Sequence, residues 1–99
     1  MSGRRGDFSL RPRAEADLED IWLYTRDRWS VEQAESYVGA LFDAFAGLAS
    51  GARVGRVSDV RSGYFKYAVG SHLIYYAKSA GQVEVVRVLH ERMDVMRHL

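Results

Sequence analysis

Cysteine is absent from this sequence of 99 residues. Its absence excludes a disulfide scaffold, a zinc site with thiolate ligands and a cysteine nucleophile. No stretch approaches the roughly 20 consecutive apolar residues that a membrane-spanning helix needs. The apolar core of a secretory signal is also missing, because Asp7 follows soon after Arg4 and Arg5. These absences favour a small soluble protein of the reducing cytoplasm, without a membrane partner.

An excess of charge of one sign is missing as well. The 14 basic residues are offset by 13 acidic ones, which leaves a formal net charge of +1. Because a dedicated duplex-DNA binder usually carries a larger basic surplus, we expect no direct sequence-specific binding of nucleic acid. The length is enough for one modest core. We therefore interpret residues 1–6 as a flexible lead and residues 7–99 as a single domain.

A short strand and two helices are predicted for the first half of the chain. Asp7–Leu10 alternates apolar and polar residues, as a strand does. Apolar residues recur at helical spacing over Arg13–Trp29, on a face made of Ala14, Leu18, Ile21, Thr25 and Trp29. Ser30 begins a capping-box pattern and Gly51 is suited to end the helix that follows. Because almost no loop separates the two helices, we expect them to fold back as a helical hairpin.

The second half of the chain predicts a sheet. Gly51–Ser62 has no clear periodicity and is interpreted as a loop. Short turns separate Tyr64–Val69, His72–Lys78 and Val83–His90, which predicts a three-stranded antiparallel meander. Glu91–Leu99 is a polar tail with one helical turn. The order strand, helix, helix and three strands predicts an α+β fold with the helices on one face of the sheet.

Four stretches, in this order and spacing, carry a resemblance to a known family: Arg11–Trp29, Ser30–Leu41, Val60–Tyr76 and Val83–Asp94. Together they resemble the ParE branch of the RelE/ParE toxins of bacterial type II toxin–antitoxin systems. The family's usual proline after the second helix is replaced by Gly51–Ala52. The resemblance implies a RelE/ParE-like fold and a non-catalytic toxin, without a cofactor, that inhibits DNA gyrase by protein–protein contact. It also implies a ParD-like ribbon-helix-helix antitoxin as a tight partner, and a role in plasmid or chromosome stabilisation.

Two alternatives stay open. The first is a ribosome-dependent mRNA endoribonuclease, the activity of the RelE branch, which needs a base, an acid and cations around the reacting phosphate. The tail lacks the tyrosine that many such enzymes carry, and arginine is a poor proton shuttle because its pKa stays above about 12. The remaining candidates for this chemistry are Arg61, Arg87, His90 and Glu91. The second alternative is an inactive interaction or regulatory module.

The residues predicted to inhibit the target are Arg61, Arg87, His90, Met93 and Asp94. We expect the Arg87 guanidinium either to line this surface or to pair with an acid such as Glu91 or Asp94. His72, His90 and His98 lack the spacing of a metal site, so no metal is expected. His72 is instead expected to pack or cap near its hairpin.

The residues predicted to bind the antitoxin are Trp22, Tyr24, Trp29, Arg53, Arg56 and Tyr67. One helix does not easily bury three large aromatic side chains against its own sheet, and exposed apolar patches usually mark partner surfaces. Burial against the second helix is the alternative for these aromatics. The arginines suit an acidic partner. Aromatic residues on both faces of the meander imply that the face away from the helices is covered by the tail, by the antitoxin or by water.

Overall fold

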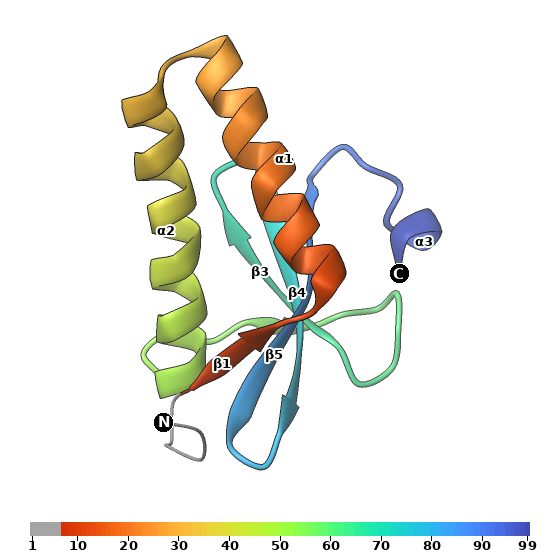
Figure 1. The fold of residues 1–99 in the computed structure, drawn as a ribbon. Coiled ribbons are helices and arrows are strands. Elements are labelled where there is room, and N and C mark those ends of the chain that lie inside the picture. Colours follow the sequence, from red (N-terminus) through yellow and green to blue (C-terminus); the bar gives the residue numbers. More distant parts are fainter. Residues whose placement is uncertain (1–6) are drawn as a thin grey trace.

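The computed structural model describes residues 7–99, and residues 1–6, predicted as a flexible lead, lie outside the described part (Figure 1). The elements are β1 (Phe8–Leu10), α1 (Pro12–Arg28), α2 (Val31–Ser50), β2 (Arg56–Val57), β3 (Phe65–Val69), β4 (His72–Ser79), β5 (Gln82–His90) and α3 (Val95–His98). α1 and α2 lie side by side over one face of the sheet, and α3 lies apart from them (Figure 1). The predicted α+β fold with a helical hairpin is confirmed. No helix within the described residues is long and apolar enough to cross a membrane.

The sheet is larger than the predicted meander. Its strand order is β1-β5-β4-β3-β2, with β1 parallel to β5 and the other neighbours antiparallel. Within Gly51–Ser62, which was predicted as a loop, Arg56 and Val57 pair with Lys66 and Phe65 as an edge strand. The loop prediction is therefore wrong at these two residues. Two residues are too few to show the alternation from which a strand is predicted.

Single residues fix the ends of the two long helices. Pro12 lies in the first turn of α1, where its missing N–H is not needed. The Ser30 Oγ accepts the Gln33 N–H at 3.0 Å and caps α2, as predicted. Gly51 ends α2 with a φ of 87°, a left-handed conformation that glycine adopts without strain. Since two residues alone separate α1 from α2, the chain must reverse sharply between them.

The main core lies between the helical hairpin and the sheet. Its fully buried members include Leu41, Ala44 and Phe45 from α2 and Ile74 and Val85 from the sheet. The predicted apolar face of α1 is confirmed at Ala14, Leu18 and Ile21, which are all buried. At Trp29 that prediction is wrong, because α1 ends one residue earlier and the indole is 69% exposed.

The face of the sheet away from the helices is also covered. Tyr75, Val86 and Leu89 are all less than 6% exposed, although none belongs to the main core cluster. Both neighbours of Tyr75 in β4 join that core, so alternation along the strand places Tyr75 on the other face. Val86 lines a hollow together with residues of the loop before β3 and of the tail after β5. These two segments therefore cover part of this face.

Candidate functional site

A hollow of about 300 Å³ lies between the start of α1, the loop before β3 and the end of the tail. Four arginines line it, namely Arg11, Arg13, Arg61 and Arg87, and its other lining residues are Pro12, Tyr64, Val86, His98 and Leu99. We call it the arginine-lined hollow. It brings together Arg61 and Arg87, two of the residues predicted to inhibit the target.

Asp17 of α1 holds the Arg87 guanidinium. Nε and Nη2 of Arg87 donate to its two carboxylate oxygens, each at 2.8 Å, and the two side chains are 13% and 12% exposed. The expected pairing of Arg87 with Glu91 or Asp94 is therefore wrong, because α1 lies directly beside β5. The Asp17 carboxylate also accepts the Val88 N–H at 2.9 Å. β1 pairs with β5 only as far as Val85, so at Val88 the carboxylate supplies the hydrogen-bond acceptor that a neighbouring strand would otherwise provide. The hydrogen bonds to Asp17 raise the pKa of Arg87.

Two guanidinium groups anchor the end of the tail. Arg87 Nη1 donates to the main-chain oxygen of His98 at 3.2 Å, and Arg61 Nη1 donates to the main-chain oxygen of Leu99. The Arg61 guanidinium also lies 5.9 Å from the centre of the Tyr64 ring. The tail therefore forms one wall of the arginine-lined hollow through contacts between side chains and main-chain oxygens.

Arg11 contributes to the opposite wall of the hollow. Its Nη2 donates to the Glu84 carboxylate at 3.0 Å and its Nη1 donates to the Tyr64 hydroxyl at 3.3 Å. The hydrogen bond from Arg11 lowers the pKa of Glu84. No ion pair of Arg13 occurs among residues 7–99. Because Glu84 and Asp17 offset only two of the four guanidinium groups, the hollow keeps an excess of positive charge.

The other residues predicted to inhibit the target do not line this hollow. The His90 ring lies against the His72 ring, with a centroid separation of 5.3 Å. Met93 is 49% exposed. The Asp94 side chain accepts a main-chain N–H and caps α3. The structure therefore divides the predicted target surface between the arginine-lined hollow and the first half of the tail.

His72 joins the β3–β4 turn to α2, which confirms its predicted packing near the hairpin. Its Nδ1 lies 2.7 Å from the Tyr37 hydroxyl. Burial, and then the neighbouring His90, lower the pKa of His72, whereas the carboxylates of Asp17 and Glu91 act in the opposite direction. Among the described residues, no group of three or more His, Cys, Asp and Glu side chains could hold a metal ion.

Three of the predicted antitoxin-binding residues lie on the second half of α1 and in the turn that follows it. Tyr24 is 68% exposed and Trp29 is 69% exposed. Trp22 is half-buried, with the Arg26 guanidinium 5.6 Å from its ring centre. The structure therefore leaves two of the three aromatics open to a partner.

The other three predicted antitoxin-binding residues lie near the sheet edge formed by β2. Arg56 is exposed on β2, whereas Arg53 is half-buried and donates its main-chain N–H to Gly47 at 3.0 Å. Tyr67 is half-buried and packs against the main core. Arg56 is thus the member of this group that is most open to a partner.

Sequence reasoning missed most of the residues that form the site. Asp17, Arg11, Tyr64 and His98 were not among the predicted site residues, yet each lines the arginine-lined hollow or binds a residue that does. They come from different elements, so no local spacing links them. Asp17 carried one signal, an acidic residue in the first turns of a helix, but that position also suits the helix dipole.

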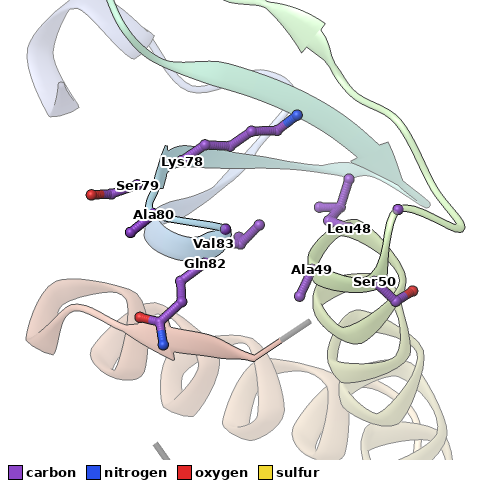
Figure 2. A pocket seen from close by; sticks show the side chains of 10 residues that line it. Leu48, Ala49, Ser50, Lys78, Ser79, Ala80, Gln82 and Val83 are labelled. Atoms are coloured by element: carbon purple, nitrogen blue, oxygen red, sulfur yellow. The ribbon is translucent and has the colours of Figure 1, made fainter. Parts of the chain in front are cut away.

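A second, larger hollow of about 540 Å³ lies between the end of α2 and the β4–β5 turn. Figure 2 shows Leu48 and Ala49 of α2 together with Lys78, Gln82 and Val83 of the hairpin around it. Lys78 is the single ionisable group in its lining. This hollow therefore lacks an acid–base pair and contains none of the predicted site residues.

A family model described as the ParE toxin of the type II toxin–antitoxin system parDE matches residues 8–95. The chain belongs to the ParE toxin family. Toxin ParE1 of Mycobacterium tuberculosis H37Rv is 48% identical over 101 aligned positions, with all of both chains covered. Toxin ParE1 of Caulobacter vibrioides is 40% identical over 93% of this chain and 96% of its own, and toxin ParE of Escherichia coli is 34% identical over 93% and 91%.

Two solved structures share the fold. A chain of the chromosomal ParDE system of P. aeruginosa superposes with a TM-score of 0.74 at 16% identity, covering 85% of this chain and 94% of that one. A chain of the RelBE2 toxin–antitoxin complex of Mycobacterium tuberculosis gives a TM-score of 0.61 at 21% identity, covering 85% and 88%. At these identities the likeness concerns the fold. It agrees with the predicted RelE/ParE-like architecture.

Proposed function

We propose that this ParE-family toxin acts in the cytoplasm by binding and inhibiting DNA gyrase without catalysis, and that a ParD-like ribbon-helix-helix antitoxin neutralises it. The family match over residues 8–95 carries the proposal. Named relatives along the whole chain are ParE toxins. The two solved structures described above come from a ParDE system and a RelBE2 toxin–antitoxin complex, which supports an antitoxin partner.

The chemistry of the arginine-lined hollow supports a non-catalytic role. Arg87 is hydrogen-bonded to Asp17, and both Arg87 and Arg61 donate to main-chain oxygens of the tail. Guanidinium groups of this kind bind anions but do not exchange protons near neutral pH. The candidate acid–base residue His90 lies outside the hollow. The hollow is therefore better suited to holding the tail in place than to cleaving a phosphodiester.

We place the target surface on the tail and the loop that supports it. Met93 and Asp94 are exposed at the turn that leads into α3, and Arg61 holds the other end of the tail. A partly exposed apolar side chain beside charged groups is a common centre of a protein–protein contact. On this proposal Arg61 acts by fixing the tail, and Met93 contacts the target directly.

Gyrase supercoiling in vitro tests the proposal. The folded toxin, free of any partner, is expected to inhibit supercoiling, and added antitoxin is expected to restore it. Arg61→Ala and Met93→Ala are each expected to weaken inhibition about tenfold, the effect of a contact worth about 1.4 kcal/mol. Arg28→Ala, which removes an exposed arginine at the hairpin turn, serves as the control. Folded protein that leaves gyrase untouched would contradict the proposal.

One observation favours the ribonuclease alternative. His98 lines the arginine-lined hollow beside Arg61 and Arg87, where an imidazole could serve as acid or base toward a bound phosphate. Mapping of mRNA ends after induction distinguishes the two functions. Cuts that disappear in His98→Ala would establish the ribonuclease, whereas growth arrest without cuts supports the gyrase inhibitor. Induction without any growth defect would instead indicate an inactive module.

A further inference from the structure

β2 leaves one edge of the sheet open. The Ser58 N–H donates to the Tyr64 carbonyl of the neighbouring strand at 2.8 Å. Along an antiparallel pair, residues that exchange hydrogen bonds alternate with residues whose N–H and C=O point away. The main-chain N–H and C=O of Val57 therefore point outward, away from β3, and are available to an added strand.

Two cations face one another at this edge. Arg56 lies directly opposite Lys66 in the register of β2 and β3. Neither side chain forms an ion pair with another residue among 7–99. Like charges at directly opposed positions destabilise a sheet. Because Lys66 in turn lies opposite Tyr75, both cations lie on the face away from the helices. A carboxylate placed beside them would relieve the repulsion.

The other face of the same edge is apolar. Val57 lies opposite Phe65, which packs against the main core and stacks on Tyr76. Val57 nevertheless remains 69% exposed, and Val54, just before β2, is 77% exposed. The edge thus offers main-chain hydrogen-bonding groups between an apolar face and a cationic face.

We propose that the β2 edge binds an extended segment of the antitoxin in which apolar and acidic residues alternate. Its apolar side chains would cover Val57, and its acidic side chains would lie beside Arg56 and Lys66. This inference rests on the proposed function, because it takes the neutralising antitoxin as the occupant.

The charges argue against two other arrangements. Pairing of the β2 edges of two copies would bring two sets of Arg56 and Lys66 together, which adds repulsion rather than relieving it. At the opposite edge of the sheet, β1 is followed by Arg11, whose charge is already paired with Glu84. Among residues 7–99, the β2 edge is therefore the sheet edge at which positive charge is unbalanced.

A proline at the open edge tests the main-chain contact. Val57→Pro removes only the outward N–H, and proline is tolerated at such edge positions. It is expected to weaken the complex with the antitoxin about tenfold, as the loss of main-chain hydrogen bonds implies, whereas Val57→Ala keeps most of the affinity. Equal affinity of the two variants would overturn the proposal. Binding to the antitoxin is measured with full-length chains whose folding is confirmed by their NMR spectra.

A charge test covers the case in which the proline variant does not fold. Arg56→Glu is expected to weaken antitoxin binding about tenfold, whereas Arg92→Glu, a reversal of an exposed cation at the start of the tail, leaves it unchanged. If both reversals weaken binding equally, the effect is one of net charge and the proposed site is wrong. If the wild-type chain binds no antitoxin at all, the proposed function fails and the occupant proposed here fails with it.

Synthetic peptides separate the edge from the rest of the antitoxin surface. An acetylated peptide of alternating valine and glutamate is expected to shift the Val57 amide resonance and slow its hydrogen exchange. A peptide of alternating valine and lysine is expected to do neither. Antitoxin binding combined with no response of Val57 to the acidic peptide would overturn the proposed edge and leave the proposed function standing.

Discussion

The two faces of the sheet are covered by different kinds of contact. On one face, α1 and α2 bury apolar side chains such as Leu41, Phe45 and Ile74, which have no exposed surface. The other face also buries Tyr75, Val86 and Leu89. The end of the tail on that side, however, is held through Arg61 and Arg87, whose guanidinium groups bind main-chain oxygens. The first kind of contact stabilises through the area removed from water, and the second through a few directional hydrogen bonds.

This difference separates the main core, which sets the global stability, from the tail, which can detach locally. Loss of an apolar contact in the main core affects the whole fold, because the helices have no other surface on which to pack. Segments with few buried apolar contacts open locally at a lower free energy than the core. We therefore expect the tail to be the first segment of the fold to detach, so that a partner can act on it without unfolding the protein.

Truncation of Phe45 is expected to have the largest effect. Phe45→Ala removes a fully buried ring that packs against Phe8 and Phe42, and should lower the free energy of unfolding by about 3–5 kcal/mol. Urea unfolding measures the change. Phe42→Ala is the control, since its ring is 39% exposed and its loss should cost about 1 kcal/mol. Equal losses in the two variants would show that the helix-covered face is not packed as described.

Neutralisation of Asp17 is expected to have the next largest effect. Asp17→Asn turns amide hydrogens toward the Arg87 donors and leaves a largely buried cation unpaired, at a cost of about 3 kcal/mol of unfolding free energy. Glu19→Gln, an exposed acid on the same helix, should change stability little.

Asp17 lies on α1 and binds Arg87, which also holds the tail, so its loss should affect both the stability of the fold and the attachment of the tail. The Asp17→Asn variant should also speed amide hydrogen exchange in the tail, because Arg87 holds both Asp17 and His98. A variant of unchanged stability would mean that the Asp17–Arg87 pair does not join α1 to β5.

Most of the fold could be predicted because its signals are local. The Ser30 cap, the Gly51 helix end and the glycine-containing hairpin turns each act within a few residues, and all appear where predicted. β2 could not be predicted, because its two residues become a strand only when they pair with β3. Trp29 was misplaced for a similar reason, since periodicity alone does not show where a helix ends.

The candidate site was harder to predict than the fold because its contacts join distant residues. Arg87 and Asp17 are 70 positions apart, and Arg61 and Leu99 are 38 apart. The sequence analysis named Arg61 and Arg87 as candidates but did not identify their partners. A nearby acid in the sequence, such as Glu91, was the natural expectation, whereas the fold brings α1 closer to the Arg87 side chain.

Removal of Arg61 should act on the tail alone. Arg61→Ala deletes an exposed guanidinium that binds the end of the tail, so the free energy of unfolding should fall by less than about 1 kcal/mol. Exchange of the Arg97 and Leu99 amide hydrogens, which are bonded within the tail, should nevertheless become several-fold faster. Arg28→Ala should leave these amides unchanged. Slower exchange, or a loss of stability as large as that of Asp17→Asn, would contradict a locally held tail.

The smallest expected effect is a dependence of the unfolding free energy on pH, caused by His72, which lies beside His90 at the end of β5. Burial and His90 lower the pKa of His72 below its ordinary value of 6.5, so the unfolded chain binds a proton at this residue more readily than the folded one. The stability that neutral His72 contributes is therefore fully present above pH 6.5. It falls as the pH drops through 6.5 and levels off below the pKa of the folded state.

His72→Phe tests this dependence, because phenylalanine keeps an aromatic ring between Tyr37 and His90 but does not titrate. The difference in unfolding free energy between wild type and variant, measured by urea between about pH 5 and pH 8, should shrink as the pH is lowered. Asp17 and Glu91 favour the protonated form of His72 and keep the effect small. A difference that grows on acidification would show that His72 is stabilised as a cation. His72 would then join the β3–β4 turn to α2 as a cation rather than by neutral packing.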